Sequence, residues 1–542
     1  MRGVSGKEWV LLSERLRPSP QLVNRYGYLL AQLLINRGVD REHESFFDLR
    51  LKNLLPYHLL PNIEEGIERI IGAVKKGERI ILFGDYDVDG VTGTAVLEEV
   101  LKEAGAKVIS VLPTRSSGYG LNKKLVSAFS KYGELLITVD NGTSAAMEID
   151  ESSMDVIIID HHNVPDEVPR KAILINPKLL DKDTELKELS SSAMCFYIGA
   201  VLRRELELDM DIRKLLDLVA LGTVGDVMPM NTANRILVSK GILVLESVLR
   251  GDIKKAGVRA LLQKAGIKEN IGTKDIAYSL APRLNAPGRI GDPRLSLRLL
   301  TERDRRKAAG LANEIEAINA KRKAITERVF KEAYEKAMEK RDRNFITLWG
   351  KGWHAGVLGI VAGRLSDLLG KPVAVFSEGE NHSVGSVRSV PGIDIYSGLK
   401  ELRDMFLKWG GHAQAVGLTL KSSLLEEFSK RADEVFAHVP KLSPPLYIDM
   451  ELSPKDVCTE TLEAVRKLEP LGEGNPYPTF LSEELTIEKV WERAARIGGV
   501  FMVCWDRNIL AAVRSGERRR VVFSVEGNTL KLVDIEDRDG SG

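Results

Sequence analysis

Short runs of apolar residues alternate with helical patterns through the first half of the chain. Apolar positions recur near every 3.6 residues between residues 24 and 76, which predicts helices. Five short apolar runs then predict strands, at residues 79–83, 108–112, 134–139, 155–159 and 171–175. A helical pattern at 91–104 separates the first two runs. Such an alternation is typical of a parallel sheet covered by helices. We therefore expect an α/β domain with a parallel sheet.

A second set of elements is expected after one long helix. Residues 304–341 contain no proline, and their apolar positions keep a helical spacing over a length of about 55 Å. The dense charge along this stretch indicates a helix that bridges two domains through solvent. Strand patterns resume in three places, at residues 345–349, 373–376 and 385–388.

A small barrel is expected at the end of the chain. A proline-rich break at 442–446 and a cluster of glycine and proline at 471–478 precede it. Short β patterns follow at residues 486–491, 500–505, 509–513, 520–525 and 529–533. About five strands is the size of an OB-like barrel.

The length of 542 residues predicts about three or four domains. We expect a helical N-terminal cap of the catalytic domain at 1–76 and the catalytic α/β domain itself at 77–302. A connecting helix at 303–343 and a second α/β domain at 344–441 come next, and a linker with the OB-like barrel fills 442–542.

Composition limits the class of protein. The 78 Lys and Arg residues balance 77 Asp and Glu residues, so the net charge of +1 gives no general attraction to nucleic acid or membrane, and any basic site must be local. No apolar stretch approaches the roughly 18 residues of a membrane span, and the N-terminal residues lack an apolar signal core. The three cysteines are too scattered for a disulfide framework or a zinc–thiolate site. We expect a cytoplasmic protein with no membrane association.

Acidic residues and histidines gather where the predicted strands end. They are Asp85, Asp87, Asp89, Asp140, Asp160, His161 and His162, and Asp226 follows a later apolar helix. Ligands bind at the carboxyl ends of the strands in open parallel sheets, and clustered carboxylates repel unless cations neutralise them. Oxygen ligands with imidazole and without thiolate suit Mn²⁺ or Mg²⁺, and two such ions can polarise a phosphoryl group and activate water. Each motif alone could be a polar turn or a structural histidine pair; their coincidence favours a metal site.

Four stretches of the sequence resemble the motifs of the DHH phosphoesterase superfamily. They are GDYDVDG at 84–90, ITVDNGTS at 137–144, IIIDHHN at 157–163 and ALGTVGDVMPMNTANR at 220–235. Further stretches resemble the RecJ family within it: NRG at 36–38, LAPRLNAPGRIGD at 280–292, GVLGIVAGRL at 356–365, GSVRS at 385–389, GGHAQAVG at 410–417 and PLGEGNPYP at 470–478. The resemblance extends over nearly the whole chain.

The resemblance implies both the architecture and the chemistry. It implies a parallel-sheet DHH domain, a DHH-associated α/β domain and an OB domain. It implies an exonuclease that hydrolyses single-stranded DNA in the 5′→3′ direction to 5′ mononucleotides, in DNA repair and recombination. By position, it implies metal ligands for two Mn²⁺ or Mg²⁺ ions at Asp87, Asp89, Asp140, His161 and Asp226. Asp85 and His162 are then the catalytic residues that orient the phosphate.

Several polar residues in glycine-rich loops can bind DNA phosphates. Guanidinium groups and hydroxyls donate hydrogen bonds to phosphate oxygens, although any single arginine could equally form a surface salt bridge. The loops match the family motifs, which favours the group as a whole. The candidates for binding DNA or its 5′ phosphate are Arg115, Arg283, Arg289, Ser386, Arg388, Ser389 and His412. In the barrel, Arg514 and residues 518–520 form either a solvated hairpin or a basic tip that contacts the strand.

Two other functions are weighed against this one. A phosphodiesterase of the same superfamily acting on short RNA or dinucleotides should lack the N-terminal cap and the barrel. A non-catalytic binding scaffold should have lost metal ligands. Besides single-stranded DNA, a single-strand-binding protein or a helicase is a candidate partner. The segment SSSAMC at 190–195 is less glycine-rich than the family pattern, and the sequence assigns it no role.

Overall fold

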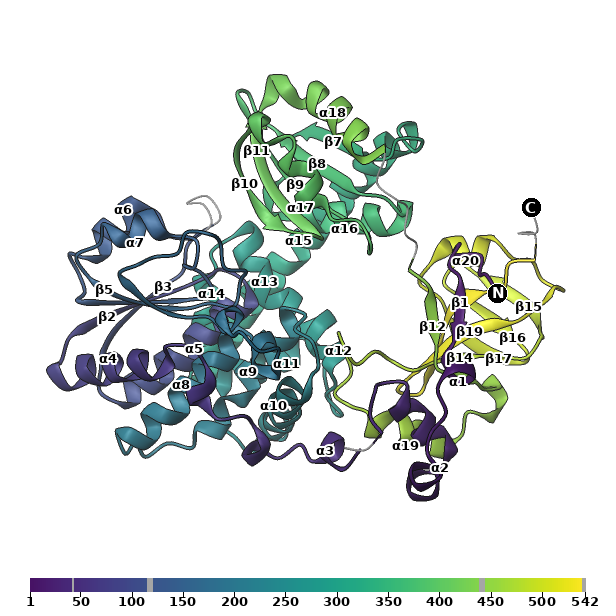
Figure 1. Cartoon of the computed structure of the whole chain (residues 1–542), viewed down its shortest axis with the longest axis horizontal. Coiled ribbons are helices and arrows are strands. Elements are labelled where there is room, and N and C mark those ends of the chain that lie inside the picture. The colour runs from purple at the N-terminus through teal and green to yellow at the C-terminus, as the bar shows by residue number, and fades with distance from the viewer. Residues whose placement is uncertain (41–42, 115–119, 438–443, 539–542) are drawn as a thin grey trace. The chain divides into compact units, whose positions relative to one another are not determined.

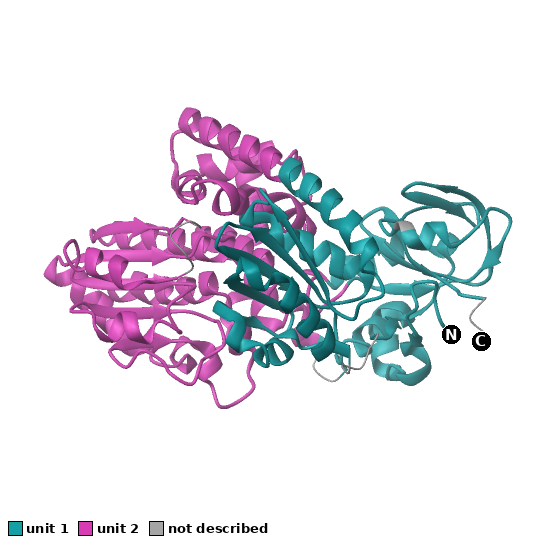
Figure 2. Cartoon of the chain, turned by 90° about the horizontal axis from the view of Figure 1, so that it is seen from above, with its two compact units in different colours: residues 1–43, 323–468, 477–542 teal, residues 44–322, 469–476 magenta. Residues whose placement is uncertain are grey.

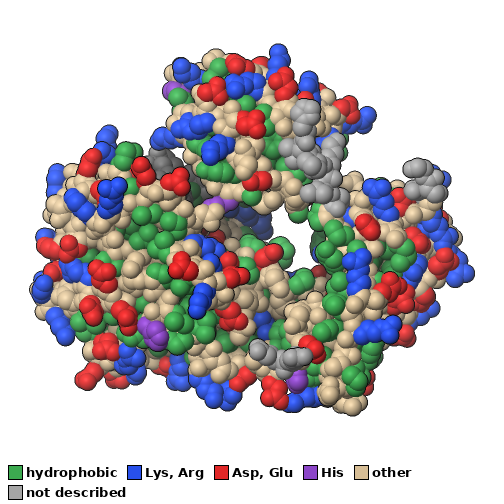
Figure 3. All heavy atoms as spheres, viewed as in Figure 1, with side chains coloured by type: hydrophobic (Ala, Val, Ile, Leu, Met, Phe, Trp, Pro, Cys, Tyr) green, Lys and Arg blue, Asp and Glu red, His purple; other side chains and the backbone are tan. Residues whose placement is uncertain are grey.

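The computed structural model of the chain describes residues 1–40, 43–114, 120–437 and 444–538 (Figure 1). These residues form two compact units, which Figure 2 distinguishes by colour. Unit 1 contains residues 1–43, 323–468 and 477–542, and unit 2 contains residues 44–322 and 469–476. Basic and acidic side chains are interspersed over the face drawn in Figure 3, as the balanced composition predicts. Among the described residues, none of the helices combines the length and apolar character needed to cross a bilayer.

Unit 2 is built on a five-stranded parallel sheet with the order β3-β2-β4-β5-β6. Its strands are β2 (Arg79–Gly84), β3 (Lys107–Val111), β4 (Leu135–Val139), β5 (Asp155–Ile159) and β6 (Ala172–Ile175). Alternate side chains of the strands belong to two different apolar clusters. Figure 1 shows the corresponding layers, with α4 (Ile63–Lys76), α5 (Val88–Glu103) and α8 (Ser191–Glu205) on one face and α6 (Lys123–Phe129) and α7 (Ala146–Asp150) on the other. The predicted parallel sheet is confirmed.

Further helices of unit 2 enlarge the core behind α5 and α8. They are α9 (Leu216–Gly225), α10 (Thr232–Arg250), α11 (Ala256–Lys264), α12 (Thr273–Asp275), α13 (Ala281–Ile290) and α14 (Arg294–Thr301). Helix α9 is apolar and almost completely buried, and it ends at Asp226, so this buried helix delivers one carboxylate to the sheet edge. The long helix predicted at 304–341 is α15 (Arg305–Glu339), whose first part belongs to unit 2 and whose remainder belongs to unit 1.

Unit 1 contains a second five-stranded sheet with the order β10-β11-β9-β8-β7. Strands β7 (Ile346–Lys351) and β8 (Val373–Glu378) are parallel, and β9 (His382–Arg388), β10 (Phe406–His412) and β11 (Ala415–Lys421) pair antiparallel. Helices α16 (Leu358–Leu369), α17 (Ile395–Lys400) and α18 (Leu425–Ala437) accompany the sheet. The core of this domain is rich in aromatic rings from β8, from α18 and from Phe345, which directly precedes β7.

The barrel of unit 1 has eight strands in the order β13-β14-β19-β20-β17-β16-β15-β18. They are β13 (Met450–Glu451), β14 (Thr479–Leu481), β15 (Leu485–Trp491), β16 (Ala494–Ile497), β17 (Val500–Val503), β18 (Arg518–Arg519), β19 (Val521–Glu526) and β20 (Thr529–Ile535). The strand predicted at 509–513 is wrong, because Asp506 accepts a hydrogen bond from Asn508 N and starts helix α20 (Arg507–Ala511). Strand β16 was not predicted, since its alanine-rich sequence carries little β propensity.

The N-terminal residues differ from the expected cap, because only residues 44–76 belong with the sheet of unit 2. Residues 1–43 belong to unit 1, where β1 (Trp9–Leu11) pairs in parallel with β12 (Leu446–Ile448). The indole of Trp9 donates a hydrogen bond to Asp534 in β20 at 2.9 Å. Short helix α1 (Leu12–Arg15), helix α2 (Pro20–Ile35) and α3 (His43–Phe47) follow. The N-terminus is therefore fastened to the barrel.

Asp449 joins the end of α2 to the start of the barrel. Its carboxylate accepts hydrogen bonds from Asn36 Nδ2 at 3.0 Å, from Arg37 at 3.2 Å and from Thr479 N at 2.9 Å. The side chains of Arg37 and Asp449 are only 7% and 10% exposed. Burial lowers the pKa of Arg37, and Asp449 opposes that shift. Asn36 and Arg37 of the NRG motif thus hold the end of α2 against the start of the barrel within unit 1.

Replacing Asp449 with alanine is expected to destabilise unit 1 by about 3 to 5 kcal/mol, since a buried guanidinium loses its carboxylate. All six tryptophans lie in unit 1, so tryptophan fluorescence during urea unfolding reports on this unit. Asp404→Ala is the control, because it removes an exposed partner of Arg431 in the same unit. Equal shifts of the unfolding midpoint in both variants would contradict a special role for Asp449.

A candidate metal centre at the sheet edge

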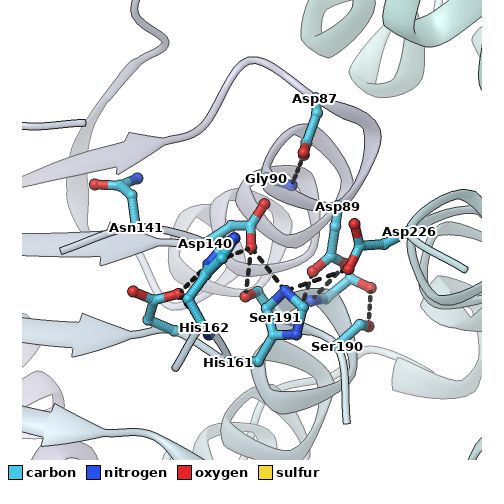
Figure 4. A network of polar contacts seen from close by, with 12 residues as sticks. Asp87, Asp89, Gly90, Asp140, Asn141, His161, His162, Ser190, Ser191 and Asp226 are labelled. Carbon is cyan, nitrogen blue, oxygen red and sulfur yellow. Dashed lines mark hydrogen bonds and ion pairs between the residues drawn. The ribbon is translucent and has the colours of Figure 1, made fainter. Parts of the chain in front are cut away.

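The sheet of unit 2 brings acidic side chains together from three strand ends and one helix end (Figure 4). After β2, Asp87 caps α5 by accepting a hydrogen bond from Gly90 N at 3.1 Å, and Asp89 lies in the first turn. A Cβ atom at Gly90 would lie 2.6 Å from Asp85 N, so only glycine allows this tight turn. The loop therefore folds its three aspartates around one helix start.

The ends of β4 and β5 supply the next groups. Asp140 follows β4 with a left-handed φ of 66°, and its backbone N donates to Ile159 O at the end of β5. Asp160, His161 and His162 follow β5 in that order, and the ring centroids of the two histidines lie 4.8 Å apart. Each strand end thus turns its polar residues toward the same edge, as the sequence predicts.

Among the described residues, three groups of ligand atoms lie close enough to hold a cation, with all atoms of each group within 4.8 Å of one another. The groups are Asp140, His161 and His162; Asp89, His161 and Asp226; and Asp85, Asp87 and Asp140. All five predicted ligands are therefore brought together, along with Asp85 and His162.

His161 lies at the centre of the cluster. Its Nε2 atom is 3.2 Å from an oxygen of Asp140 and 3.3 Å from an oxygen of Asp226. This buried nitrogen nevertheless makes no hydrogen bond to the described residues. Burial lowers the pKa of His161, which favours the neutral imidazole that binds metals. The donor set of carboxylates and a neutral imidazole fits Mn²⁺ or Mg²⁺.

A positive charge is needed to stabilise the ionised carboxylates of the cluster. Burial and the charges of Asp87 and Asp89 raise the pKa of Asp140 well above its ordinary value. Burial and the same two neighbours also raise the pKa of Asp226. In the absence of a cation these carboxylates therefore take up protons, and a divalent ion competes with protons for them.

The neighbouring carboxylate of Asp160 raises the pKa of His162. Its Nδ1 atom lies 2.8 Å from Asp160 Oδ1, and the other oxygen of Asp160 accepts a hydrogen bond from Thr143 N. Burial lowers the pKa of His162, but the hydrogen bond and charge of Asp160 outweigh it and raise the pKa to about 9. Asp160 belongs to the DHH-like motif, yet its orienting role is evident only from this contact.

The start of α8 supplies contacts that the sequence did not predict. The carboxylate of Asp89 accepts hydrogen bonds from Ser191 N at 2.7 Å and from Ser192 N at 3.1 Å. The hydroxyl of Ser191 donates to Asp140 at 3.1 Å. Serines before a helical run are typical of a helix start, and this signal was the only indication available.

The predicted phosphate-binding residues have different surroundings. Arg115 lies outside the described residues. Arg283 in α13 donates to Glu316 in α15 at 2.6 Å, which ties the two helices together. Arg289 lies near the end of α13, where a Cβ atom at Gly288 would be 2.3 Å from Tyr86 O. The backbone of Gly288, the residue before Arg289, is therefore packed closely against the aspartate-bearing loop.

The remaining candidates are in unit 1. Ser386 and Arg388 are alternate residues of β9, and an Arg388 nitrogen donates to Ser386 Oγ at 3.0 Å. A Cβ atom at Gly359, at the start of α16, would lie 2.8 Å from Arg388. The hydroxyl of Ser389 donates to Ile393 O, and His412 ends β10. Arg388 and Ser386 thus meet beside the N-terminus of a helix.

Two of the four arginines expected in either a solvated hairpin or a basic tip are paired with acidic side chains. Arg519 is buried and paired with Glu517, and Arg520 is paired with Glu451. Exposed aromatic side chains occur instead along β15 and β17 and just after β17. They are Trp491, Phe501 and Trp505, with Lys489 Nζ lying 5.2 Å from the centre of the Trp491 ring. The structure offers an aromatic face that the sequence analysis missed.

Three parts of the chain match known domain families. Residues 79–223 match the DHH family, N-terminal domain, residues 342–438 match the DHHA1 domain, and residues 448–499 match the RecJ OB domain. The chain is 33% identical over 503 residues to the single-stranded-DNA-specific exonuclease RecJ of Dickeya dadantii, which covers 87% of this chain and 86% of that protein.

Solved structures of RecJ also match the chain. The structure of RecJ from Thermus thermophilus in complex with Mn²⁺ matches with a TM-score of 0.85 and 27% identity, over 98% of this chain and 80% of that one. The structure of the same protein in complex with Mg²⁺ matches with a TM-score of 0.79 and 26% identity, over 98% and 79% of the two chains.

In the metal-free protein, His162 is expected to titrate near pH 9, and Asp160→Asn should lower its pKa, because the hydrogen bond and the charge that oppose the effect of burial are then lost. Charged His162 stabilises the native fold below about pH 6.5, and this contribution is lost as the pH rises through about 9. NMR of histidine-labelled protein measures the pKa directly. Asp155→Asn, at the opposite end of β5, is the control. A His162 pKa that is the same in the wild type and in Asp160→Asn would exclude Asp160 as its cause.

Proposed function

The chain belongs to the RecJ family of single-stranded-DNA-specific exonucleases, and from this membership we propose how it degrades DNA. It is a metal-dependent exonuclease that acts on single-stranded DNA. We infer that it hydrolyses the strand in the 5′→3′ direction and releases 5′ mononucleotides. We further place it in the cytoplasm, in DNA repair and recombination, with a single-strand-binding protein or a helicase as partner.

The convergence of carboxylates on His161 carries this proposal. We assign Asp87, Asp89, Asp140, His161 and Asp226 as the ligands of two divalent ions. When bound, such a pair of ions supplies Lewis-acid activation of the phosphoryl group and of the attacking water.

His162 and Asp85 act beside the ligands. Asp160 raises the pKa of His162 in the metal-free protein, and a protonated His162 can donate a hydrogen bond to a phosphate oxygen and stabilise the negative charge that develops there. We assign Asp85, which lies near Asp87 and Asp140, to orienting the phosphate as well.

The direction of hydrolysis requires a site for the strand's end. We assign the terminal 5′ phosphate to Arg388 and Ser386, since a guanidinium and a hydroxyl that lie together beside the start of α16 offer donors to one phosphate. Ser389 and His412 are further candidates on the same sheet. Arg289 is assigned to an inner phosphate, whereas Arg283 holds α13 against α15.

The barrel is assigned to the rest of the strand. Lys489, Arg496 and Phe501 are register partners across β15, β16 and β17, and the ring centres of Trp491 and Phe501 are 5.8 Å apart. Cations interleaved with exposed aromatic rings bind single strands by stacking bases and neutralising phosphates. This face therefore supports binding without sequence preference.

Digestion of single strands labelled at the 5′ or the 3′ end tests the proposed function. We expect mononucleotides to appear first from the 5′ label, with Mn²⁺ or Mg²⁺ and not with EDTA, and Asp140→Asn to be inactive. Single-stranded RNA and dinucleotides run in parallel. Early release from the 3′ label would overturn the direction, and faster cleavage of RNA or dinucleotides would favour the alternative phosphodiesterase.

Arg388→Ala is expected to weaken the preference for 5′-phosphorylated ends more than it affects the chemistry. Losing one charged donor to a phosphate costs about 1.5 to 3 kcal/mol, or roughly 10 to 150-fold in affinity. The measurement compares KM and kcat for 5′-phosphorylated and 5′-hydroxyl strands. Arg364→Ala, in α16 of the same unit and paired with Glu327, is the matched control. A phosphate preference that survives in Arg388→Ala places the end elsewhere, with Arg289 the next candidate.

Phe501→Ala is expected to weaken binding of single-stranded DNA by roughly 5 to 150-fold, because stacking one base on an aromatic ring contributes about 1 to 3 kcal/mol. Fluorescence anisotropy of a labelled oligonucleotide in EDTA measures affinity without cleavage. Tyr447→Ala is the control, since Tyr447 is exposed to 55% and Phe501 to 57%, but Tyr447 lies on β12 outside the face. Equal losses in the two variants would count against the aromatic face.

A further inference from the structure

Three consecutive serines begin α8, and all three are buried. Ser190 caps the helix, with its hydroxyl accepting a hydrogen bond from Ala193 N at 3.2 Å. The backbone amides of Ser191 and Ser192 donate to the two oxygens of Asp89. Any residue could supply these backbone donors, so they do not explain why serine stands here.

The hydroxyl of Ser191 makes a contact that only its side chain can supply. It donates to Asp140 Oδ1 at 3.1 Å, and the same oxygen lies 3.2 Å from His161 Nε2 (Figure 4). The terminal torsion of an aspartate is broad and two-fold, so its carboxylate needs a partner to fix its orientation. One hydrogen bond from a buried, immobile helix start provides that constraint.

We propose that Ser191 is a positioning residue that orients Asp140 for binding of the divalent cation. This proposal rests on the metal centre of the proposed function and adds a residue to which the sequence assigned no role. Because a serine and not a glycine stands at position 191, a hydroxyl group is present beside Asp140. The backbone amide of Ser191 holds Asp89, and the hydroxyl of Ser191 holds Asp140. The two proposed ligands come from different elements, and this one residue keeps the distance between them constant.

Ser192 offers a matched control within the same segment. It is equally buried, and its hydroxyl pairs with Ser190 Oγ at 2.8 Å, which in turn lies 3.1 Å from Thr223 Oγ1. Ser191→Ala and Ser192→Ala therefore each remove one oxygen and one buried hydrogen bond, one residue apart. Only Ser191→Ala removes a contact to a proposed metal ligand.

The experiment titrates Mn²⁺ into the full-length, metal-free protein without DNA, by calorimetry and by the electron paramagnetic resonance signal of free Mn²⁺. We expect Ser191→Ala to lower the affinity for one ion about 10 to 100-fold and Ser192→Ala to stay within about twofold of the wild type. Half-maximal cleavage should need correspondingly more Mn²⁺ in Ser191→Ala, with KM for DNA unchanged. Thermal unfolding in EDTA checks that both variants fold, and Ser191→Thr, which keeps the hydroxyl, should retain the wild-type affinity.

The outcomes separate this proposal from the proposed function. Wild-type affinity for Mn²⁺ in Ser191→Ala overturns the positioning role, and so does an equal loss in Ser191→Ala and Ser192→Ala. A wild-type protein that binds Mn²⁺ but does not degrade single-stranded DNA overturns the function alone, and the comparison of affinities still decides the role of Ser191. A wild-type protein that binds no Mn²⁺ overturns both.

Discussion

The mutual repulsion of buried carboxylates at the carboxyl edge of the parallel sheet is the constraint that organises unit 2. Burial and neighbouring charges raise the pKa values of Asp140 and Asp226, so the cluster opposes its own ionisation. The surrounding elements supply positive potential in response. Helices α5 and α8 both direct their N-termini at aspartates, and Asp160 keeps His162 protonated. A divalent cation completes this compensation, which is why the same groups that oppose folding without metal bind it strongly.

The sequence predicted the parts of this site that depend on local pattern. Apolar strands that end in an acid or a histidine are visible in the chain, and topology alone then brings Asp140 and His161 to one edge. The contact of Ser191 with Asp140 joins residues from separate elements and depends on the final packing, so no local signal reveals it. The same reason explains the N-terminal residues. Their association with unit 1 comes from pairing between β1 and β12, more than 400 residues apart in sequence.

The arginines show that residue type and flanking glycine do not establish a phosphate site. Arg283 matches a family motif, yet Glu316 occupies its guanidinium, and Arg520 in the expected basic tip is similarly engaged by Glu451. Arg388 has a neutral neighbour in Ser386 and lies beside a helix N-terminus. The acidic partners of Arg283 and Arg520 lie far from them in the sequence, so the local motif alone does not reveal that these arginines are already paired.

The two units separate the chemistry from most of the proposed strand contacts. The hydrogen bonds described for the metal centre join residues of unit 2, whereas Ser386, Arg388 and the aromatic face belong to unit 1. The charges of the metal centre are buried, so added salt screens them little. Contacts to the strand are of two kinds. Pairing of cationic side chains with phosphates weakens as salt is added, whereas stacking of bases on aromatic rings depends only weakly on salt. Ionic strength therefore changes the concentration of bound strand much more than it changes the assembled centre. A fall in activity with added salt is accordingly evidence about strand binding before it is evidence about hydrolysis at the metal centre.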